Sequence, residues 1–335
     1  MRDEKFLGDN SHGTTEPPVS VILTVVNEAA HLEESINAVL NSQYSGAIEI
    51  AISVGPSRDN TREIADSLAQ RDPRIKVIEN PSGRTPDGLN SAIAATKNEI
   101  IMRVDGHSSI GPDYIREAVR TLSETDAVNV GGIMAAEGIT PFQRAVARAM
   151  RSPIGVGASR FHTGGSAGSV DTVYLGVFKR SALIGVGGYD SRFTRAQDWE
   201  LNYRLREKGG VIWFNPNLTV TYRPRSTFRS LAKQYFEYGR WRAAVTRYHK
   251  GTANFRYLAP PINVFLQAFS ILLGTFWAPV FFIPIFTYLV AILIAALVIG
   301  RSWAERVRLP IVLIIMHFSW GIGFITSPRT LISNS

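Results

Sequence analysis

The fold of this chain is decided by the stretch VSVILTVVNE, residues 19–28. Its first eight residues are almost all aliphatic and largely β-branched, which is typical of a parallel strand covered on both faces. The run stops at Asn27 and Glu28, and a helical pattern with an apolar stripe follows at residues 32–40. A buried strand followed directly by an amphipathic helix predicts the first unit of an α/β sheet.

The same alternation continues through the next eighty residues. Apolar runs predict further strands at 47–54, 74–79 and 99–104. Helical patterns separate them at 60–70 and from Thr85 onward, and another follows at 115–122. The pattern predicts a doubly wound, mostly parallel sheet, in which ligands bind beyond the carboxyl ends of the strands.

Charged side chains occur where those strands end. Glu28 follows the first strand, Asp59 the second, and Asp105-Gly106-His107 the fourth, with Arg84 just before the third helix. Alternate residues of an extended segment point the same way, so Asp105 and His107 are placed to bind one cation. A simple Asp-Gly turn is the alternative. Neither the phosphate-binding motif G-x-x-x-x-G-K-[ST] nor the dinucleotide-binding motif G-x-G-x-x-G follows the first strand. An ATPase or a dinucleotide-dependent enzyme is therefore not supported.

Composition separates the two ends of the chain. Its 335 residues include no cysteine, which excludes disulfides and thiolate metal sites, and the net charge is +8. From Arg223 onward there are 13 Lys and Arg against 2 Asp and Glu, whereas the first 222 residues hold 23 against 26. A nucleic-acid-binding protein more often carries its basic patch on the folded domain, so no nucleic-acid partner is expected.

The C-terminal end is strongly apolar. Residues 262–299 contain no charged side chain, and Pro279 and Pro284 divide them into two expected helices. A charged loop is expected at 301–308 and a third apolar stretch at 309–325. We therefore predict a transmembrane region at 259–327 with about three helices and a short tail at 328–335, the alternative being a buried core hairpin.

The segments around the α/β domain complete the predicted organisation. Residues 223–258 are basic and aromatic, which favours an interfacial helix on anionic lipid over a nucleic-acid arm. Residues 1–17 are polar and lack the apolar core of a signal peptide, so a disordered lead is expected. The domain at 18–222 is then expected on the cytoplasmic face of the plasma membrane, in agreement with the arginines of the 301–308 loop.

Several segments together resemble a known family. The stretches at 19–43, 57–61, 89–107 and 187–210 are similar to family 2 glycosyltransferases of the GT-A fold. The closer resemblance is to the membrane-attached subgroup that includes the succinoglycan-type glucosyltransferases, which have Asp-Gly-His where relatives have Asp-x-Asp. It covers about residues 18–325, including QYFEYGRW at 234–241 and MHFSWGIGF at 316–324.

The resemblance implies a donor site and a metal. A divalent Mn²⁺ or Mg²⁺ ion on the diphosphate would be held by Asp105 and His107, and imidazole is the softer ligand, which leans toward Mn²⁺. A turn histidine bonded to backbone is the alternative. VGPS at 54–57 replaces the family's usual Asp-Asp-Gly-Ser, so the nucleotide base stays open. The residues implied in nucleotide-sugar binding are Val26, Glu28, Asp59, Arg84 and Asp105.

The resemblance also implies a catalytic base, Asp198, which follows Gln197 where relatives have a Glu-Asp pair. Leu201 and Leu205 lie on the same helical face as Asp198, and a helix N-cap is its alternative role. QYFEYGRW resembles a Gln-x-x-Arg-Trp element with a longer spacing, and Trp199 has core packing as its alternative. The residues implied in acceptor binding are Trp199, Glu200, Gln234, Arg240 and Trp241.

These features predict an inverting, metal-dependent transfer of a sugar from a nucleoside diphosphate to a polyprenyl-diphosphate-linked saccharide, for surface polysaccharide. The Gly- and Ser-rich segment 159–170 is expected to be a lid over the donor or a surface linker. Two other functions stay open: a polyprenyl-phosphate sugar synthase, and a membrane protein that binds nucleotide sugars without turnover.

Overall fold

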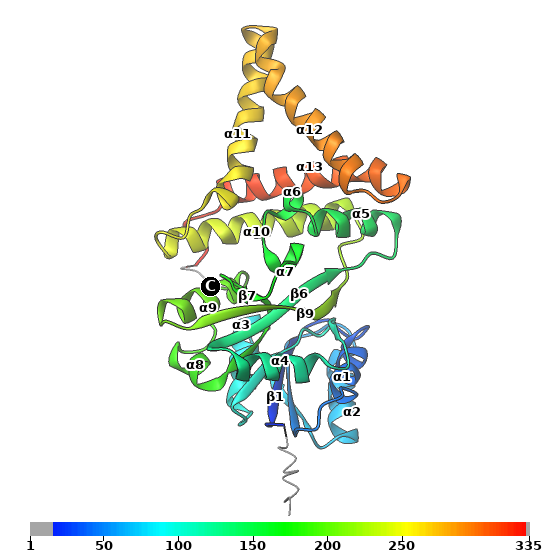
Figure 1. The fold of residues 1–335 in the computed structure, drawn as a ribbon, viewed down its shortest axis with the longest axis vertical. Helices are drawn as coiled ribbons and strands as arrows, with labels where there is room; N and C mark the ends of the chain where they lie inside the picture. Colours follow the sequence, from blue (N-terminus) through cyan, green and yellow to red (C-terminus); the bar gives the residue numbers. More distant parts are fainter. Residues whose placement is uncertain (1–15, 333–335) are drawn as a thin grey trace, which may run out of the picture.

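The computed structural model describes residues 16–332, so most of the expected N-terminal lead and the last three residues of the tail lie outside it. An α/β domain carries a cap formed by the long helices of residues 228–325, and residues 255–299 project from this cap as a helical hairpin (Figure 1). The strands are β1 Val19–Val25, β2 Ile48–Val54, β3 Ile75–Glu79, β4 Ile100–Arg103, β5 Ser109–Ile110, β6 Ala127–Ala136, β7 Gly168–Ser169, β8 Tyr174–Lys179 and β9 Val211–Tyr222.

The helices of the α/β domain alternate with these strands. They are α1 Leu32–Leu40, α2 Thr61–Arg71, α3 Thr85–Ala94, α4 Tyr114–Glu124, α5 Pro141–Met150, α6 Pro153–Val156, α7 Arg160–Thr163, α8 Arg180–Gly185 and α9 Gln197–Glu207. The remaining helices are α10 Phe228–Tyr248, α11 Phe255–Phe276, the 3₁₀ turn η1 Pro279–Phe282, α12 Ile283–Ile299 and α13 Trp303–Ile325. The predicted strands and helices before residue 125 are confirmed with small shifts at their ends.

One sheet runs through the domain in the order β3-β2-β1-β4-β8-β6-β9-β5, with β7 paired to β9. The pairs β3-β2, β2-β1 and β1-β4 are parallel, as the alternating pattern predicts. Beyond β4 the sheet is mixed, because β8 is antiparallel to both β4 and β6 while β9 is parallel to β6. The α/β prediction is confirmed, and its parallel character holds for the N-terminal half.

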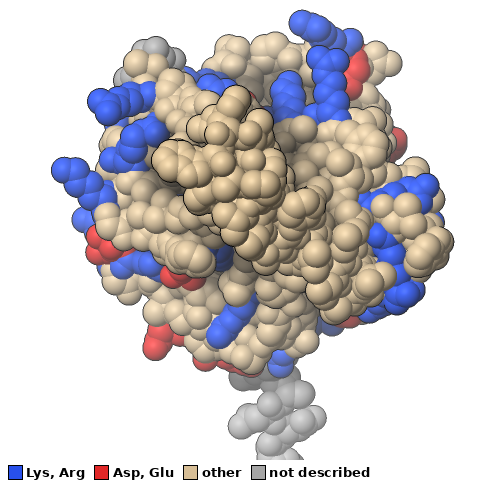
Figure 2. All heavy atoms as spheres, turned by 90° about the horizontal axis from the view of Figure 1, so that it is seen from above, with Lys and Arg blue, Asp and Glu red and all other residues tan. Residues whose placement is uncertain are grey.

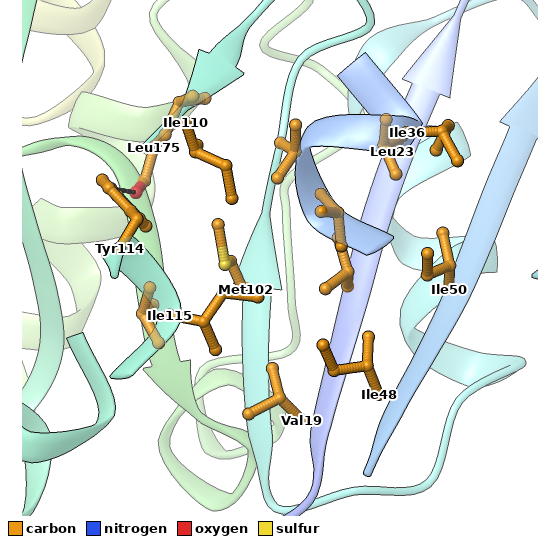
Figure 3. Packing of buried hydrophobic residues seen from close by; sticks show 14 of the residues in the cluster. Val19, Leu23, Ile36, Ile48, Ile50, Met102, Ile110, Tyr114, Ile115 and Leu175 are labelled. Carbon is orange, nitrogen blue, oxygen red and sulfur yellow. Dashed lines mark hydrogen bonds between the residues drawn. The ribbon is translucent and has the colours of Figure 1, made fainter. Parts of the chain in front are cut away.

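Strand β1 is buried on both faces. Val21 and Leu23 of β1 pack with residues of α1 and α4 on one face, and Figure 3 shows this layer around Met102 and Ile115. Ile22, between them in the sequence, packs with residues of α3 and α9 on the other face. Alternate side chains of a strand point to opposite faces, so helices on both sides explain the unbroken apolar run of β1.

The cap shares a hydrophobic core with the α/β domain. Met134 of β6 and residues of α5 pack against α10, α12 and α13. Two glycines let α10 and α13 approach closely: a Cβ atom on Gly239 would lie 2.0 Å from the carbonyl oxygen of Trp320, and one on Gly323 2.1 Å from that of Phe236. The cap is therefore packed rigidly on the α/β domain and is not joined to it by a flexible linker alone.

Three helical segments are long and apolar enough to cross a membrane: Phe255–Phe276, Pro279–Ile299 and Trp303–Ile325. The first two form the projecting hairpin, whereas α13 lies across its base alongside α10 (Figure 1). The charged loop expected at 301–308 is wrong, because α13 already begins at Trp303. Ser302 caps that helix by accepting the N–H of Glu305, a pairing that favours helix initiation.

The hairpin has an exposed apolar surface. Seen from its tip, an uncharged ridge crosses the molecule, and Lys and Arg side chains lie around it (Figure 2). Phe276 and Trp277 at the turn are each 82% exposed, and Val298 of α12 is 76% exposed. Apolar surface of this extent, rimmed by basic groups, is typical of a membrane-contacting face.

Candidate active site

A cavity of about 780 Å³ lies between the carboxyl ends of β1 and β4, the start of α9 and the cap helices. Its lining includes three carboxylates, those of Glu28, Asp105 and Asp198. Within residues 16–332 six arginines also line it, an excess of positive charge that suits a phosphate-bearing ligand. They are Arg84, Arg103, Arg195, Arg225, Arg242 and Arg256.

The turn after β1 places Glu28 in the cavity. Asn27 has a φ of 56°, in the left-handed region that asparagine tolerates, and its side-chain oxygen accepts the N–H of Arg58. Asp59 lies behind this turn, where it accepts the N–H of Ala29 and bonds to Thr61. The Thr61 hydroxyl is the main cause that lowers the pKa of Asp59. Asp59 thus joins the ends of β1 and β2 and does not line the cavity.

The turn after β4 brings His107 against Glu28. This turn packs closely on β1 at Gly106, where a Cβ atom would lie 2.7 Å from a methyl group of Val25. His107 Nδ1 is 2.8 Å from Glu28 Oε1, and this contact is the main cause that raises the pKa of His107. The Ser35 hydroxyl donates to the carbonyl oxygens of Asp105 and Ser108, which fixes the turn from α1.

A buried arginine links the two other carboxylates. Arg103 Nη2 is 2.8 Å from Asp105 Oδ1, and Arg103 Nη1 bonds to Asp198 Oδ1. Burial by itself raises the pKa of Asp105, but the Arg103 guanidinium outweighs it and holds that pKa below its usual range. For Asp198, burial outweighs Arg103 and the pKa is raised. The two carboxylates therefore share one cation and differ in their affinity for protons.

Asp198 faces the cavity from the first turn of α9, with its side chain 34% exposed. It is not the N-cap, because that position is held by Ala196, whose φ is 59°. A left-handed alanine is sparsely populated, and such backbone occurs where surrounding structure holds a functional segment in place. Leu201 and Leu205 are buried beneath the helix, so α9 is anchored on its apolar side.

A divalent metal fits this site only with help from a substrate. No group of three or more His, Asp or Glu side chains arranged to hold a metal occurs among residues 16–332. Asp105 keeps its second oxygen, which has only a 3.5 Å contact with the Tyr174 hydroxyl, and His107 lines the same cavity. Mg²⁺ and related ions commonly take one or two protein ligands and complete their shell with phosphate oxygens and water.

The residues predicted to bind the acceptor fall into two groups. Gln234, Trp199 and Trp241 line the cavity, although both tryptophans are largely buried in a cluster with Phe193. Gln234 donates to the hydroxyl groups of Tyr222 and Tyr238. Packing into the core accounts for most of the surface of the two rings.

The other two predicted acceptor residues lie outside the cavity. Glu200 is buried beneath α9, where it pairs with Arg204 at 2.8 Å and contacts His249 at 3.1 Å. Arg240 pairs with Glu237 on the same helix at 2.9 Å. Both side chains are therefore engaged in the packing of α9 and α10.

The Gly- and Ser-rich segment also borders the cavity. It contains the short helix α7 and the strand β7 in place of a continuous loop. Ser159, Phe161 and His162 line the cavity from it. Burial lowers the pKa of His162 to about 3, so its ring is neutral at ordinary pH. The segment forms one wall of the site.

Sequence reasoning did not single out Arg103 or Tyr174, and it recognised Arg242 only as one of the basic residues of the segment 223–258. A signal for Arg103 exists, because it is the one charged residue within the apolar strand at 99–104 after Glu99, and a buried charge requires a partner. Tyr174 has no comparable signal. Arg242 is one of several arginines of α10, and only the packing of three distant helices distinguishes it.

Comparison with known proteins agrees with this architecture. The family model "Glycosyl transferase family 2" matches residues 20–187. The succinoglycan biosynthesis protein ExoA of Rhizobium meliloti is 31% identical over 91% of this chain and 93% of its own length. A dolichyl N-acetyl-alpha-D-glucosaminyl phosphate 3-beta-D-2,3-diacetamido-2,3-dideoxy-beta-D-glucuronosyltransferase of Methanococcus voltae is 25% identical over 91% and 95%.

Solved structures show the same fold. The mannosyltransferase PcManGT from Pyrobaculum calidifontis, in complex with GDP-Man and Mn²⁺, superposes with a TM-score of 0.59 at 18% identity and covers 90% of this chain and 86% of that one. S. aureus TarS 1-349 with UDP-GlcNAc gives a TM-score of 0.52 at 13% identity, covering 92% and 91%. From the family match and the full-length relative, this chain belongs to glycosyl transferase family 2 and is a glycosyltransferase with a GT-A-type fold.

Proposed function

We propose that the protein transfers a sugar, with inversion, from a nucleoside diphosphate to a polyprenyl-diphosphate-linked saccharide during surface polysaccharide synthesis. One observation carries the proposal: a single cavity contains the Asp105–His107 turn and Asp198 and continues to α11, the first helix of the apolar hairpin. The full-length similarity to a succinoglycan biosynthesis protein and to a dolichyl-phosphate-sugar transferase supports it.

The donor is assigned to the strand ends. Val26, Glu28 and Arg84 line this end of the cavity beside Asp105, and Asp59 supports the turn behind them. Mn²⁺ or Mg²⁺, held by Asp105, His107 and the diphosphate, would neutralise the charge that develops on the leaving phosphate. PcManGT was solved with GDP-Man and Mn²⁺, which supports a nucleotide sugar and a divalent ion as ligands here.

The transfer step is assigned to Asp198. The acceptor hydroxyl oxygen attacks the anomeric carbon from the face opposite the phosphate, the bond from that carbon to the phosphate oxygen breaks, and the nucleoside diphosphate leaves. The hydroxyl proton passes to Asp198, whose raised pKa makes it a better base than an ordinary aspartate. Arg103 orients the carboxylate by binding one of its oxygens.

The membrane arrangement follows from the hairpin. We assign α11 and α12 to the bilayer and α10 and α13 to its surface, because α13 lies across the base of the hairpin (Figure 1). A hairpin returns the chain to the side from which it entered, so the α/β domain and Arg301, Arg306 and Arg308 share one side. The positive-inside rule makes that side the cytoplasm.

The test uses the full-length protein in detergent with radiolabelled nucleotide sugars, chosen by a thermal-shift panel of nucleoside diphosphates. Mn²⁺-dependent transfer to a polyprenyl-diphosphate-linked saccharide is expected, and it should be lost in chelator and in Asp105→Asn. Transfer to polyprenyl phosphate alone would assign a sugar synthase instead. Donor binding without hydrolysis or transfer to either lipid would assign a binding protein.

A further inference from the structure

Arg242 has an unusual environment at the cap end of the cavity. Its guanidinium carbon lies 4.4 Å from the ring centre of Trp199 on α9 and 4.1 Å from that of Tyr257 on α11. The guanidinium group of Arg242 on α10 is thus in contact with two aromatic rings, one from α9 and one from α11. A planar guanidinium donates hydrogen bonds only from its N–H edges, and the two ring contacts do not satisfy these edges.

Those edges lack protein partners. Nε and Nη1 of Arg242 are inaccessible to solvent and have no hydrogen-bond partner within residues 16–332. Tyr257 and Arg256 act electrostatically on Arg242, and no carboxylate in the described part of the chain, residues 16–332, does so. Burial lowers the pKa of Arg242 to about 10, which still leaves it charged at neutral pH. An unpaired buried cation is costly, so it requires an explanation.

A second arginine shares this end of the cavity. Arg256 contacts the same tyrosine as Arg242. The guanidinium carbon of Arg256 lies 4.8 Å from the ring centre of Tyr257, and its Nη2 donates to the Tyr257 hydroxyl at 2.8 Å. Arg256 acts unfavourably on Arg242, as two like charges do. Both conditions, the unpaired N–H groups and the repulsion, are relieved by one multiply charged anion.

Location identifies the anion. Arg256 and Tyr257 belong to the first turn of α11, where the hairpin that we assign to the bilayer begins, so they lie at the level expected for lipid headgroups. Trp199, the other neighbour of Arg242, directly follows Asp198 in the chain. The arginines therefore lie between the proposed base and the membrane surface.

We propose that Arg242 and Arg256 bind the phosphate of the lipid-linked acceptor, and so place its sugar hydroxyl beside Asp198; this rests on the function proposed above. Binding requires the Arg242 side chain to turn toward the cavity that it lines, where its planar guanidinium fork suits two oxygens of one phosphate group. The donor diphosphate is assigned to the other end, where Arg84, Asp105 and His107 lie.

Kinetics of the full-length enzyme test this assignment. Arg242→Gln should raise KM for the lipid-linked acceptor about 10-fold or more, whereas KM for the nucleotide sugar and the rate of donor hydrolysis should change less than about 2-fold. Arg242→Lys should recover little, because lysine keeps the charge and loses the fork. Arg256→Gln should act in the same direction. Arg144→Gln, an exposed arginine of α5 outside the cavity, is the matched control.

Soluble probes read the site without turnover. Farnesyl diphosphate should raise the melting temperature of the wild type and compete with the lipid acceptor, and both effects should be lost in Arg242→Gln. If farnesyl diphosphate or inorganic pyrophosphate competes with the nucleotide sugar instead, the two arginines bind the donor diphosphate, and the proposal is overturned. An Arg242→Gln defect that disappears when anionic lipid is omitted would overturn it in favour of bulk headgroup binding.

The two proposals can fail separately. Wild-type protein that binds farnesyl diphosphate through Arg242 but transfers sugar to neither lipid would contradict the proposed function alone. Normal transfer with an unchanged acceptor KM in Arg242→Gln and Arg256→Gln would contradict the phosphate site alone. Intact donor hydrolysis in each variant shows that the catalytic domain is folded.

Discussion

The two ends of the cavity differ in how their charges are paired. At the strand ends, His107 contacts Glu28, and Arg103 bonds to both Asp105 and Asp198. At the cap end, Arg242 is in contact with two rings, and no carboxylate among residues 16–332 acts on it. The donor end is thus held in place by its own ion pairs, whereas the cap end has a positive charge without a paired carboxylate, and the proposed phosphate site rests on this difference.

This difference follows from how each end is built. The donor end is formed by turns after parallel strands, whose positions are fixed by the register between β1, β2 and β4. The cap end is formed by α9, α10 and α11, which meet only in the folded chain. Preorganised charges favour the chemical step, while unpaired charges favour capture of a particular substrate.

The largest expected effect on transfer comes from replacing the proposed catalytic base, Asp198, at the donor end. Asp198→Asn keeps the shape and the contact with Arg103 but accepts no proton at neutral pH. Transfer should fall by about 10²-fold or more, the usual scale for loss of a general base, with donor binding nearly unchanged. Single-turnover transfer and donor titration measure the two quantities separately.

Asp171→Asn is the matched control for this prediction, since it removes a 72% exposed carboxylate that does not line the cavity. It should transfer sugar at the wild-type rate. Equal losses of donor binding and transfer in Asp198→Asn would show that this carboxylate is structural.

The predictability of the two ends also differs. The donor end could be predicted from the sequence, because continuous apolar runs identify the strands. The polar residues that follow these strands lie together at one edge of a parallel sheet. The sequence predicts Glu28, Arg84, Asp105 and His107 at the site in this way. The ion pairs of Arg103 could not be predicted from the sequence. Arg103 lies within the apolar strand, and its two partners are 2 and 95 residues away.

The cap end could not be read from the sequence in the same way. The basic and aromatic residues of α10 were recognised as a set, yet helical periodicity does not say which of them faces α9 and α11. Arg240 was chosen by resemblance and pairs with Glu237, whereas Arg242, two positions later, enters the cavity. Packing of helices from distant parts of the chain decided between neighbours.

A smaller effect is expected from loosening the bridge between the two carboxylates. Arg103→Lys keeps a positive charge but cannot bind Asp105 and Asp198 with one planar group. Transfer should fall about 10-fold through misplacement of the base. Because Arg103 partly offsets the burial that raises the pKa of Asp198, that pKa should rise further.

The sign of the accompanying pH effect is fixed. The base acts as a carboxylate, so kcat falls as pH decreases through its pKa, and a higher pKa moves this acid limb to higher pH. The kcat–pH profiles of wild type and Arg103→Lys measure the shift. An acid limb at the same pH in both would show that Arg103 does not act on Asp198.

The smallest expected effect concerns stability at the boundary between the two ends. His162 is buried beside Arg256, and its pKa of about 3 lies below the 6.5 of an unfolded histidine. Between these values the unfolded chain binds a proton that the folded chain does not, so stability falls as pH decreases from about 6.5. His162→Gln should remove about 2 kcal/mol of the loss between pH 7 and pH 5, roughly 3 °C in Tm for a chain of this size. His31→Gln, which removes an exposed histidine, should leave that loss unchanged. If His162→Gln loses as much Tm as the wild type over this range, the imidazole is protonated in the folded protein, and the boundary between the paired and unpaired ends carries one more cation than we assign to it.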